Sequence, residues 1–548
     1  MKRFIPSMLI LCFLVQSSFG FADPYPKNPN IDALNYRFEF LLSDETDEIK
    51  GKATVDVRFK TEGIKSLRLD LINTSEALKG KGMTVTEVMS NGKAVSYSHE
   101  NNVLLISLPN PSAKSQRSQF TITYSGIPAT GLKIGPNKHG DRTFFSDNWP
   151  NKGRNWLPTI DHPYDKATCE FVVTAPAHYQ VVSNGLVVEK TDLDSGMRLT
   201  HWKQSVPIAP WLYVLGVARF AIQHVDDFQG KAIETWVYPQ DRDAGFYDFA
   251  EPTKQVLEFY SDYVGPFSYE RLANIQSNSV SGGMEAASAI LYSESSVVGD
   301  RNVRWRNVVI HEIAHQWFGN SVTEYDWDDV WLSEGFATYF TLLFIEHQYG
   351  RDEFLAGLRS SKTRVDNFQV KNPDYTIVHD NLDNMAKVTT GQTYQKGSWI
   401  LHMLRGVVGT DVFWQGIQNY YAKYQNLNAT TADFQREMEE ASGMDLSTFF
   451  RQWLYKGGML KYSGSWKYYS RTKEVTIKLD QVQTDGSFFE MPVQVGIKYP
   501  GKNKMTIELL QVNQQSNSFT IKVEAEPESL VLDPNTWVLM DAELKRAN

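Results

Sequence analysis

The chain has 548 residues, of which 42% are hydrophobic and 22% charged, and its formal net charge is −9. This length exceeds what one hydrophobic core supports and predicts roughly two to four domains, with the composition of a globular protein rather than a disordered one. The sequence contains no block of basic residues, and together with the negative net charge this argues against nucleic acid as a partner.

The first 22 residues predict a secretory signal peptide. A short basic start precedes an apolar run over residues 8–15, and small and polar residues follow. The run is too short to cross a bilayer as a helix, which disfavours a membrane anchor. We therefore expect cleavage after Gly20 or Ala22, a secreted or periplasmic protein, and no transmembrane segment in the mature chain. Cys169 is then the one remaining cysteine, so no intrachain disulfide is expected.

Residues 23–228 predict an N-terminal β domain resembling a sandwich. Hydrophobic residues alternate with other residues over much of this stretch, as in Tyr36, Phe38 and Phe40. Alternation of this kind is typical of half-buried strands, and turn signals such as Asn91-Gly92 separate the runs.

Residues 229–456 predict a mostly helical domain with a few strands at its start, around Ile233–Tyr238. Hydrophobic residues recur here at the three- and four-residue spacing of helices. The predicted helices are Thr253–Tyr263, Val303–Phe318, Val330–Tyr349, Gly397–Val408 and Ala432–Ala441.

The predicted helix Val303–Phe318 carries the pattern His-Glu-x-x-His at His311, Glu312 and His315. Residues four apart project from one face of a helix, so the two histidines can share one zinc ion. Glu312 lies about 100° further round the helix, where it reaches a water on the metal rather than the metal itself. The alternative is a solvated helix with two chance histidines, which the flanking apolar residues disfavour.

A third zinc ligand is predicted at Glu334. A catalytic zinc needs three protein ligands and one open position. Glu334 follows His315 with 18 residues between, which leaves room for a turn and a second helix. An acid in an aromatic and apolar stretch needs a strong partner. The sequence thus predicts one zinc ion per chain, bound by His311, His315 and Glu334.

Residues 457–548 predict a small C-terminal β-sandwich. Gly457-Gly458 interrupts the helical pattern, and alternation returns in Val475, Ile477 and Leu479. The predicted fold is therefore multidomain α+β, with β domains on both sides of a helical catalytic domain.

His-Glu-x-x-His followed after 18 residues by Glu resembles the gluzincin aminopeptidases, the family of aminopeptidase N and the leukotriene hydrolases. Three further segments agree. The segment 282–286, Gly-Gly-Met-Glu-Ala, is similar to the exopeptidase motif Gly-x-Met-Glu-Asn. The segment 393–397 is similar to the one carrying the family's catalytic tyrosine, and residues 156–168 are similar to a signature of its N-terminal domain. The resemblance implies a thermolysin-like catalytic domain.

The resemblance also implies a peptide hydrolysis mechanism. Glu312 would act as the general base for a zinc-activated water, and the Tyr394 hydroxyl would stabilise the oxyanion. Without the resemblance, Tyr394 would be interpreted as a packing aromatic at the start of a helix.

The segment around Glu285 is implied to bind the substrate. Glu285 would hold the free α-ammonium of a peptide, and Met284 would line the first side-chain pocket. Gly282 and Gly283 would allow the substrate to pair with this segment like an added strand. The simpler alternative is a Gly-Gly turn before a surface helix. The implied partners are thus peptides with a free N-terminus.

The sequence departs from the family pattern in two places. Ala286 replaces the usual Asn, and the second amine-contacting residue of the family falls near Asn148 and Trp149, where no Gln or acid is evident in that alignment. The sequence also ends without the large C-terminal helical domain of many relatives, from which we expect a more open cleft.

Three other functions compete with the aminopeptidase hypothesis. A thermolysin-like endopeptidase would leave Glu285 unused and would cleave capped peptides. A non-catalytic scaffold would have no use for all five of the zinc-site and catalytic residues. Epoxide hydrolysis, as in the leukotriene hydrolases, has no specific support in the sequence. The oligomeric state is not predicted.

Overall fold

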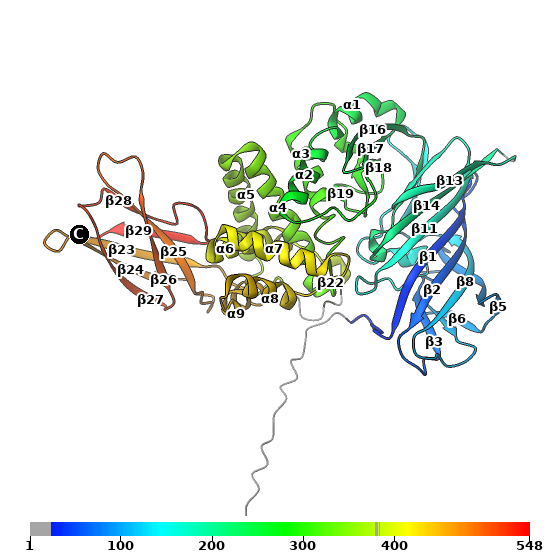
Figure 1. Ribbon diagram of the computed structural model, residues 1–548, viewed down its shortest axis with the longest axis horizontal. Helices are drawn as coiled ribbons and strands as arrows, with labels where there is room; N and C mark the ends of the chain where they lie inside the picture. Colours follow the sequence, from blue (N-terminus) through cyan, green and yellow to red (C-terminus); the bar gives the residue numbers. More distant parts are fainter. Residues whose placement is uncertain (1–23, 195, 379–381, 383, 548) are drawn as a thin grey trace, which may run out of the picture.

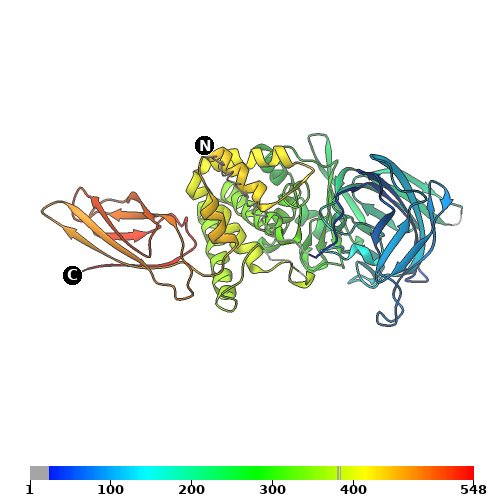
Figure 2. The ribbon, with the colours of Figure 1, turned by 90° about the horizontal axis from the view of Figure 1, so that it is seen from below.

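The computed structural model describes residues 24–194, 196–378, 382 and 384–547. The predicted signal peptide lies outside these residues. The N-terminal β domain, the helical domain and the C-terminal β domain follow one another along the long axis of the molecule (Figures 1 and 2). This arrangement confirms the predicted multidomain α+β fold. In the described ranges, no helix is both long and apolar enough to cross a membrane.

The N-terminal domain consists of three sheets. Their strand orders are β13-β14-β11-β1-β2-β8-β4-β5, β12-β15-β10-β9 and β3-β7-β6. The strands are β1 (Ile31–Leu41), β2 (Ile49–Phe59), β3 (Ser66–Asp70), β4 (Gly82–Ser90), β5 (Lys93–Ala94), β6 (Tyr97–Glu100), β7 (Val103–Ser107), β8 (Gln116–Ile127), β9 (Leu132–Pro136), β10 (Arg142–Ser146), β11 (Ala167–Pro176), β12 (Gln180–Ser183), β13 (Leu186–Asp192), β14 (Met197–Ile208) and β15 (Leu215–Ala218).

The large sheet shows why the alternating sequence pattern is informative. In β1, Tyr36, Phe38 and Phe40 are buried, and the residues between them are partly exposed. Most neighbours are antiparallel, but β1 pairs in parallel with β11, with Asn35 opposite Thr168. The core of the domain therefore joins segments far apart in the chain.

The catalytic domain combines a five-stranded sheet, ordered β16-β17-β18-β20-β19, with nine helices in the described residues. A short pair, β21 (Thr323–Glu324) and β22 (Asn428–Ala429), lies apart from that sheet. The strands of the sheet are β16 (Ala221–Phe228), β17 (Lys231–Val237), β18 (Leu272–Ser277), β19 (Gly283–Met284) and β20 (Ala289–Ser293). The helices are α1 (Arg242–Phe249), α2 (Thr253–Tyr263), α3 (Val303–Ala314), α4 (Trp331–Tyr349), α5 (Arg351–Gln369), α6 (Gly397–Val408), α7 (Thr410–Tyr424), α8 (Thr431–Ser442) and α9 (Ser447–Leu454).

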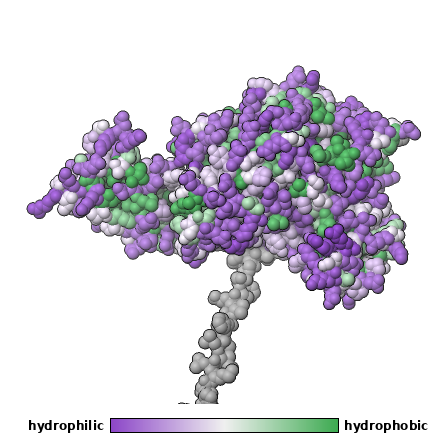
Figure 3. Space-filling model, viewed as in Figure 1, coloured by the Kyte–Doolittle hydropathy of each residue, from purple (hydrophilic) through white to green (hydrophobic). Residues whose placement is uncertain are grey.

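The C-terminal domain is formed by two sheets, β27-β24-β23-β29 and β26-β25-β28. Its surface, like that of the rest of the face in Figure 3, is mostly hydrophilic with separate apolar patches. The strands are β23 (Lys461–Tyr469), β24 (Glu474–Gln481), β25 (Met491–Lys498), β26 (Thr506–Val512), β27 (Ser516–Lys522), β28 (Ser529–Leu532) and β29 (Asp541–Arg546).

The boundary expected at residue 228 falls inside a hairpin. β16 pairs antiparallel with β17 over Ala221–Val237 and so belongs to the five-stranded sheet. We propose that the catalytic domain begins near Ala221. The helix predicted over Val303–Phe318 ends earlier, at Ala314, because the chain turns after His315 toward Gly319, whose φ is +106°.

Candidate active site

Two packed helices place the predicted zinc ligands. The Asn302 side chain caps α3 by accepting a hydrogen bond from Arg304 N, and His311 lies in the last turn of that helix. His315 follows as the C-terminal cap with helical backbone angles, so it remains on the face of His311. Glu334 lies in the first turn of α4, a helix that is buried over most of its length.

The three ligand atoms converge. His311 Nε2 and His315 Nε2 lie 3.1 Å apart, and Glu334 Oε2 lies 3.4 Å from the first and 3.2 Å from the second. Ligands of a tetrahedral zinc, each bonded at about 2.0–2.2 Å, are separated by roughly 3.3–3.6 Å. The observed triangle is therefore close to that of a zinc site.

The donor chemistry also fits a cation. Glu334 Oε2 is buried and accepts no hydrogen bond within the described structure. Burial alone would raise the pKa of Glu334, but the imidazoles of His311 and His315 outweigh it and lower that pKa to about 2. A buried, ionised carboxylate beside two imidazole nitrogens is a donor set that suits zinc.

Two groups near Nδ1 fix the orientation of the His315 ring. Its Nδ1 lies 3.1 Å from the Phe318 carbonyl oxygen and 3.1 Å from Ser333 Oγ. Donation of Nδ1–H to that carbonyl leaves the Nε2 lone pair free for a metal, the usual arrangement of a zinc-ligating histidine. A Cβ atom at Gly319 would lie 2.2 Å from Ser333 Oγ, so a larger residue there would disturb this support.

Glu312 lies beside the triangle of the three predicted zinc-ligand atoms and is not part of it. Its side chain is buried, and a Cβ atom at Gly283 would lie 2.2 Å from its carboxyl carbon. The backbone of β19 therefore approaches Glu312 as closely as only glycine allows. Burial, reinforced by the charge of Glu285, raises the pKa of Glu312 well above its usual value.

Tyr394 reaches the site from a π-helical turn over Gln392–Lys396, just before α6. Its hydroxyl donates a hydrogen bond of 2.6 Å to Glu334 Oε1. Burial and the neighbouring Glu334 raise the pKa of Tyr394 well above 10, so the hydroxyl keeps its proton and remains a donor. The sequence predicted a helix start here; π-helical turns are frequent at functional sites.

Glu285 lies at the edge of the five-stranded sheet. β19 is the last strand of that sheet, and it pairs on one side only, with β20. The Glu285 carbonyl accepts hydrogen bonds from Gln316 Nε2 (3.1 Å) and Asn320 Nδ2 (2.6 Å), which tie the segment to the turn after His315. The residues after the two glycines do not form a surface helix, which was the alternative interpretation of the sequence.

The Glu285 carboxyl group faces the cleft. Oε1 is buried without a hydrogen-bond partner in the described structure, and it lies 3.9 Å from His315 Nδ1. Burial raises the pKa of Glu285 to about 7, with His315 opposing the shift and the charges of Glu334 and Asp147 adding to it.

A cavity of about 420 Å³ opens in front of these groups. Gly282 and Met284 line it, and a Cβ atom at Gly282 would meet open space. Glu334 and Tyr394 line it as well. The predicted catalytic, substrate-binding and metal residues thus meet in one place.

The N-terminal domain supplies another wall of this cavity. Asp147, Trp149 and Lys152 line it, and Lys152 Nζ lies 2.5 Å from Asp147 Oδ2. Asn148 instead points into its own domain, where it bonds Tyr213 O and Trp156 Nε1. Asp147 was missed in the sequence, although it adjoins the position expected to contact the amine.

A half-buried lysine joins the same domain to the turn after the zinc helix. Lys166 Nζ donates hydrogen bonds to the carbonyl oxygens of Asn320 (3.1 Å), Ser321 (2.8 Å) and Leu427 (3.3 Å). Asn320 in turn holds the Glu285 carbonyl. The N-terminal domain is therefore linked to the substrate-facing segment through two successive contacts.

Two protein families match the chain. Residues 249–453 match the peptidase family M1 domain, and residues 32–212 match the peptidase M1 N-terminal domain. The first range contains every predicted site residue, and the second contains Asp147 and Lys166.

Individual relatives agree with these matches. Human glutamyl aminopeptidase is 31% identical over 327 residues, which cover 57% of this chain and 34% of the human protein. The chain thus matches about a third of the length of such relatives. A probable aminopeptidase of Sulfurisphaera tokodaii is 26% identical over 73% of this chain and 52% of its own. The M1 zinc metallopeptidase of Deinococcus radiodurans shares the fold, with a TM-score of 0.67, 24% identity, and coverage of 77% of this chain and 93% of that one.

Proposed function

The chain belongs to peptidase family M1, and we propose on this basis that it is a zinc-dependent aminopeptidase. It removes the first residue of peptides that have a free N-terminus. The observation that carries the proposal is the convergence of His311, His315 and Glu334 beside a free sheet edge that ends at Glu285.

Each side chain has one role in the proposed reaction. Zinc bound by the three ligands supplies Lewis acidity, which lowers the pKa of a water and polarises the substrate carbonyl. Glu312 accepts the proton of the attacking water and passes it to the leaving amine. The Tyr394 hydroxyl donates a hydrogen bond to the oxyanion of the tetrahedral intermediate.

Two acids supply the negative field for the ammonium group. Glu285 is buried at the end of β19 and forms a charge-assisted bond with the substrate amine. Asp147 lines the same cavity from the N-terminal domain, and its charge acts on Glu285. We infer that Asp147 assists amine recognition from the N-terminal domain, with Lys152 Nζ, 2.5 Å from Asp147 Oδ2, offsetting part of its charge.

A panel of aminoacyl fluorogenic amides, assayed with and without a chelator, tests this proposal. We expect about one zinc per chain, hydrolysis of the amides, and loss of activity on chelation that zinc restores. Full activity in a metal-free preparation would refute it.

N-acetylated versions of the same peptides distinguish an aminopeptidase from an endopeptidase. Acetylation removes the positive charge that Glu285 binds, so we expect poor cleavage of the capped peptides. Replacing Glu285 with Ala should weaken cleavage of free peptides by about 30-fold or more while zinc remains bound, because one partner of a desolvated charge pair is lost. Equal cleavage of free and capped peptides by the unmodified protein would favour the endopeptidase.

We further propose that the protein is exported, either to a periplasm or out of the cell. The basic start and apolar run of the first 22 residues support this proposal. N-terminal sequencing of the mature protein tests it, with Phe21 or Asp23 expected as the first residue. Retention of Met1 in material isolated from its native source would contradict it.

A further inference from the structure

β9 has a free edge beside the active site. It is the last strand of the sheet β12-β15-β10-β9 and pairs only with β10. Gly131 O accepts a hydrogen bond from Asp147 N, so the residues bonded to β10 are the odd-numbered ones. The N–H and C=O groups of Leu132 and Ile134 therefore point away from the sheet.

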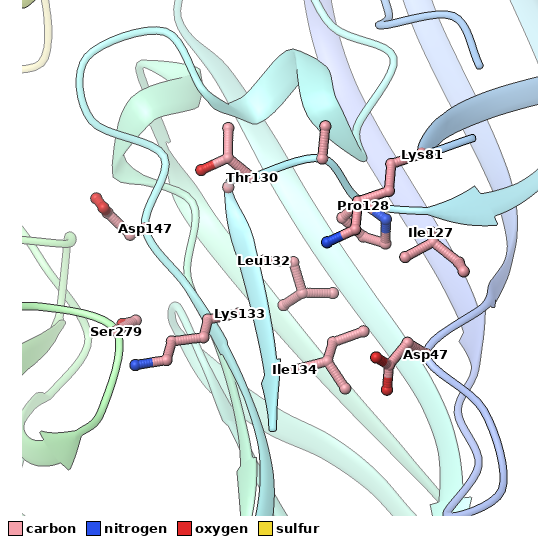
Figure 4. Close-up of a pocket in the computed structure, with 12 residues that line it drawn as sticks. Asp47, Lys81, Ile127, Pro128, Thr130, Leu132, Lys133, Ile134, Asp147 and Ser279 are labelled. Atoms are coloured by element: carbon pink, nitrogen blue, oxygen red, sulfur yellow. The ribbon is translucent and has the colours of Figure 1, made fainter. Parts of the chain in front are cut away.

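A cavity of about 300 Å³ follows this edge. Figure 4 shows Leu132 and Ile134 on one side of β9, near Ile127 and Pro128, with Lys133 on the other side, directed toward Ser279. An unpaired strand edge in an open, partly apolar groove is the setting in which proteins bind extended peptides by strand addition.

The groove adjoins the active-site cavity. Asp147 and Ser279 line both. The segment that begins at Asn278 is attached to the β9–β10 hairpin: Asn278 Nδ2 donates to Pro136 O (3.1 Å), and Ser279 Oγ donates to Ser146 O (2.9 Å). The free edges of β9 and β19 are thus held together across the domain boundary.

The direction of a bound substrate leads into this groove. A substrate whose ammonium group lies at Glu285, and which runs antiparallel to the segment 279–285, continues toward Ser279. An aminopeptidase removes only the first residue, so all other residues of its substrate lie on the carboxyl side of the cleaved bond. Those residues are the ones that reach the shared boundary at Ser279.

We propose that the β9 groove is an extended substrate site, which binds the residues after the cleaved bond by adding them as a strand to β9. The inference rests on the proposed aminopeptidase function and specifies its substrate class. The enzyme then prefers extended peptides over dipeptides.

The charges of the groove favour a carboxylate on the bound peptide. Asp47 is paired with Arg142 at 2.6 Å, and Asp147 is paired with Lys152. Lys133 Nζ donates to Asn278 O (2.6 Å), and Lys81 forms no ion pair with any described residue. The uncompensated charge is therefore positive, which suits an acidic side chain or the α-carboxylate of a short peptide.

A proline substitution tests the strand addition. Ile134→Pro removes an outward N–H without breaking a bond to β10, and proline is tolerated on edge strands. The matched control Ile134→Thr keeps the N–H at the same position. Thermal melting of both variants verifies that they fold like the unmodified protein.

The readout is kcat/KM for peptides of roughly two, four and eight residues with the same first two residues, since an added strand rises about 3.3 Å per residue. We expect kcat/KM to increase with length in the unmodified protein and in Ile134→Thr. For the longest peptide, Ile134→Pro should lose about 3- to 10-fold, mainly through a higher KM, as expected for one lost hydrogen bond.

A charge reversal tests the carboxylate preference. Lys81→Glu should lower kcat/KM for long peptides with an acidic tail by about 3-fold or more and leave those with a neutral tail little changed. Lys504→Glu, on an exposed lysine of the C-terminal domain, is the control. Binding of a fluorescent octapeptide to the Glu312→Gln protein, measured by anisotropy, gives the same comparison without turnover.

The outcomes separate the two proposals. If free-amine amides are cleaved but Ile134→Pro changes neither the length dependence nor octapeptide affinity, the groove is not a substrate site and the aminopeptidase function stands. If no free-amine substrate is cleaved, the proposed function fails; weaker octapeptide binding by Ile134→Pro in the Glu312→Gln background would still identify β9 as a peptide site.

Discussion

The two β domains pack against opposite ends of the catalytic domain and contact different parts of it (Figure 1). The N-terminal joint includes an aromatic contact between Trp149 and Trp327 and the hydrogen bonds from Lys166 Nζ to three carbonyl groups next to the active site. The C-terminal joint combines aromatic and polar contacts: Trp537 stacks on His402 with ring centres 4.7 Å apart, His402 Nε2 lies 2.8 Å from Thr536 O, and Lys362 Nζ lies 2.7 Å from Asp541 Oδ1.

The difference indicates different roles. Hydrogen bonds depend on direction, so the N-terminal joint fixes the position of the turn after His315 and, through Asn320, of Glu285. The described contacts of the C-terminal joint, such as that of Trp537 with His402, involve no residue that lines the active-site cavity, so we expect this joint to stabilise the fold without setting the cleft geometry. Accordingly, the N-terminal domain lines the active-site cavity through Asp147, and no residue of the described C-terminal domain does.

The largest effect should come from within the catalytic domain, with both joints intact. Glu312→Gln removes the proposed base but no zinc ligand. We expect turnover to fall by about 10²–10⁴-fold, with zinc content unchanged by mass spectrometry of the metal. Loss of zinc in this variant would show that Glu312 is a ligand rather than a base.

The next largest effect concerns Tyr394, whose position depends on the π-helical turn before α6. Tyr394→Phe removes only the hydroxyl, and loss of one oxyanion donor lowers kcat by about 10²–10³-fold. KM should change less than kcat, because the interaction forms mainly in the transition state. Unchanged turnover would mean that another group faces the oxyanion.

The N-terminal joint should affect activity more weakly. Lys166→Met leaves the carbonyl of the buried residue Ser321 without its donor and removes one of two donors from the Asn320 and Leu427 carbonyls, which destabilises the protein by about 1–3 kcal/mol. We also expect kcat/KM to fall by about 10-fold, because the turn that holds Glu285 loses its support. Lys478→Met, on an exposed lysine of β24, is the matched control. Normal kcat/KM in the folded Lys166→Met protein would refute a positioning role.

The C-terminal joint should affect stability alone. Trp537→Leu removes much of a partly buried aromatic contact, and we expect about 2–3 kcal/mol of destabilisation. At a temperature where the variant is folded, kcat/KM should stay within about twofold of the unmodified value. A larger loss would show that both joints shape the cleft.

The smallest predicted effect is a difference in pH dependence between the joints. Burial raises the pKa of Asp165, next to Lys166, to about 8. Because the pKa of Asp165 is higher in the folded than in the unfolded protein, protonation of Asp165 stabilises the folded form. This contribution to the free energy of unfolding is complete below pH ~4 and is lost as the pH rises through about 8. Burial lowers the pKa of His402 to about 3, so it stays neutral over this range.

Asp165→Asn isolates this contribution, because Asn keeps the acceptor for Ala33 N but does not titrate. We expect the variant to gain about 1–3 kcal/mol relative to the unmodified protein between pH 5 and 8.5, measured by urea unfolding. Parallel pH profiles of the two proteins would contradict the raised pKa.

Local patterns predicted much of the fold. The bounds of α2 and α6 match those expected from helical spacing. The helices α1, α5, α7 and α9 were missed. α5 buries only a narrow row that includes Phe354, Leu358 and Val365, and α7 is rich in aromatic residues that also favour strands.

The site was predictable where its residues follow a fixed spacing. His311, His315 and Glu334 lie on two neighbouring helices, so the distance along the sequence determines how they meet. Asp147 and Lys166 were not assigned a role, because the cavity that Asp147 shares with Glu285 and the carbonyl groups that Lys166 binds involve the other domain. Lys166 binds Ser321, and nothing local in the sequence specifies that pairing.

The parallel pairing of β1 with β11 constrains how the N-terminal domain can fold. Joining Asn35 to Thr168 closes a loop of about 130 residues, an entropic barrier that hairpins avoid. Until β11 is available, one edge of β1 is unpaired although it lies in the middle of the finished sheet. A fragment that ends before Ala167 would lack β11 and would therefore expose a long apolar strand edge, and its natural outcome is aggregation rather than a smaller stable domain.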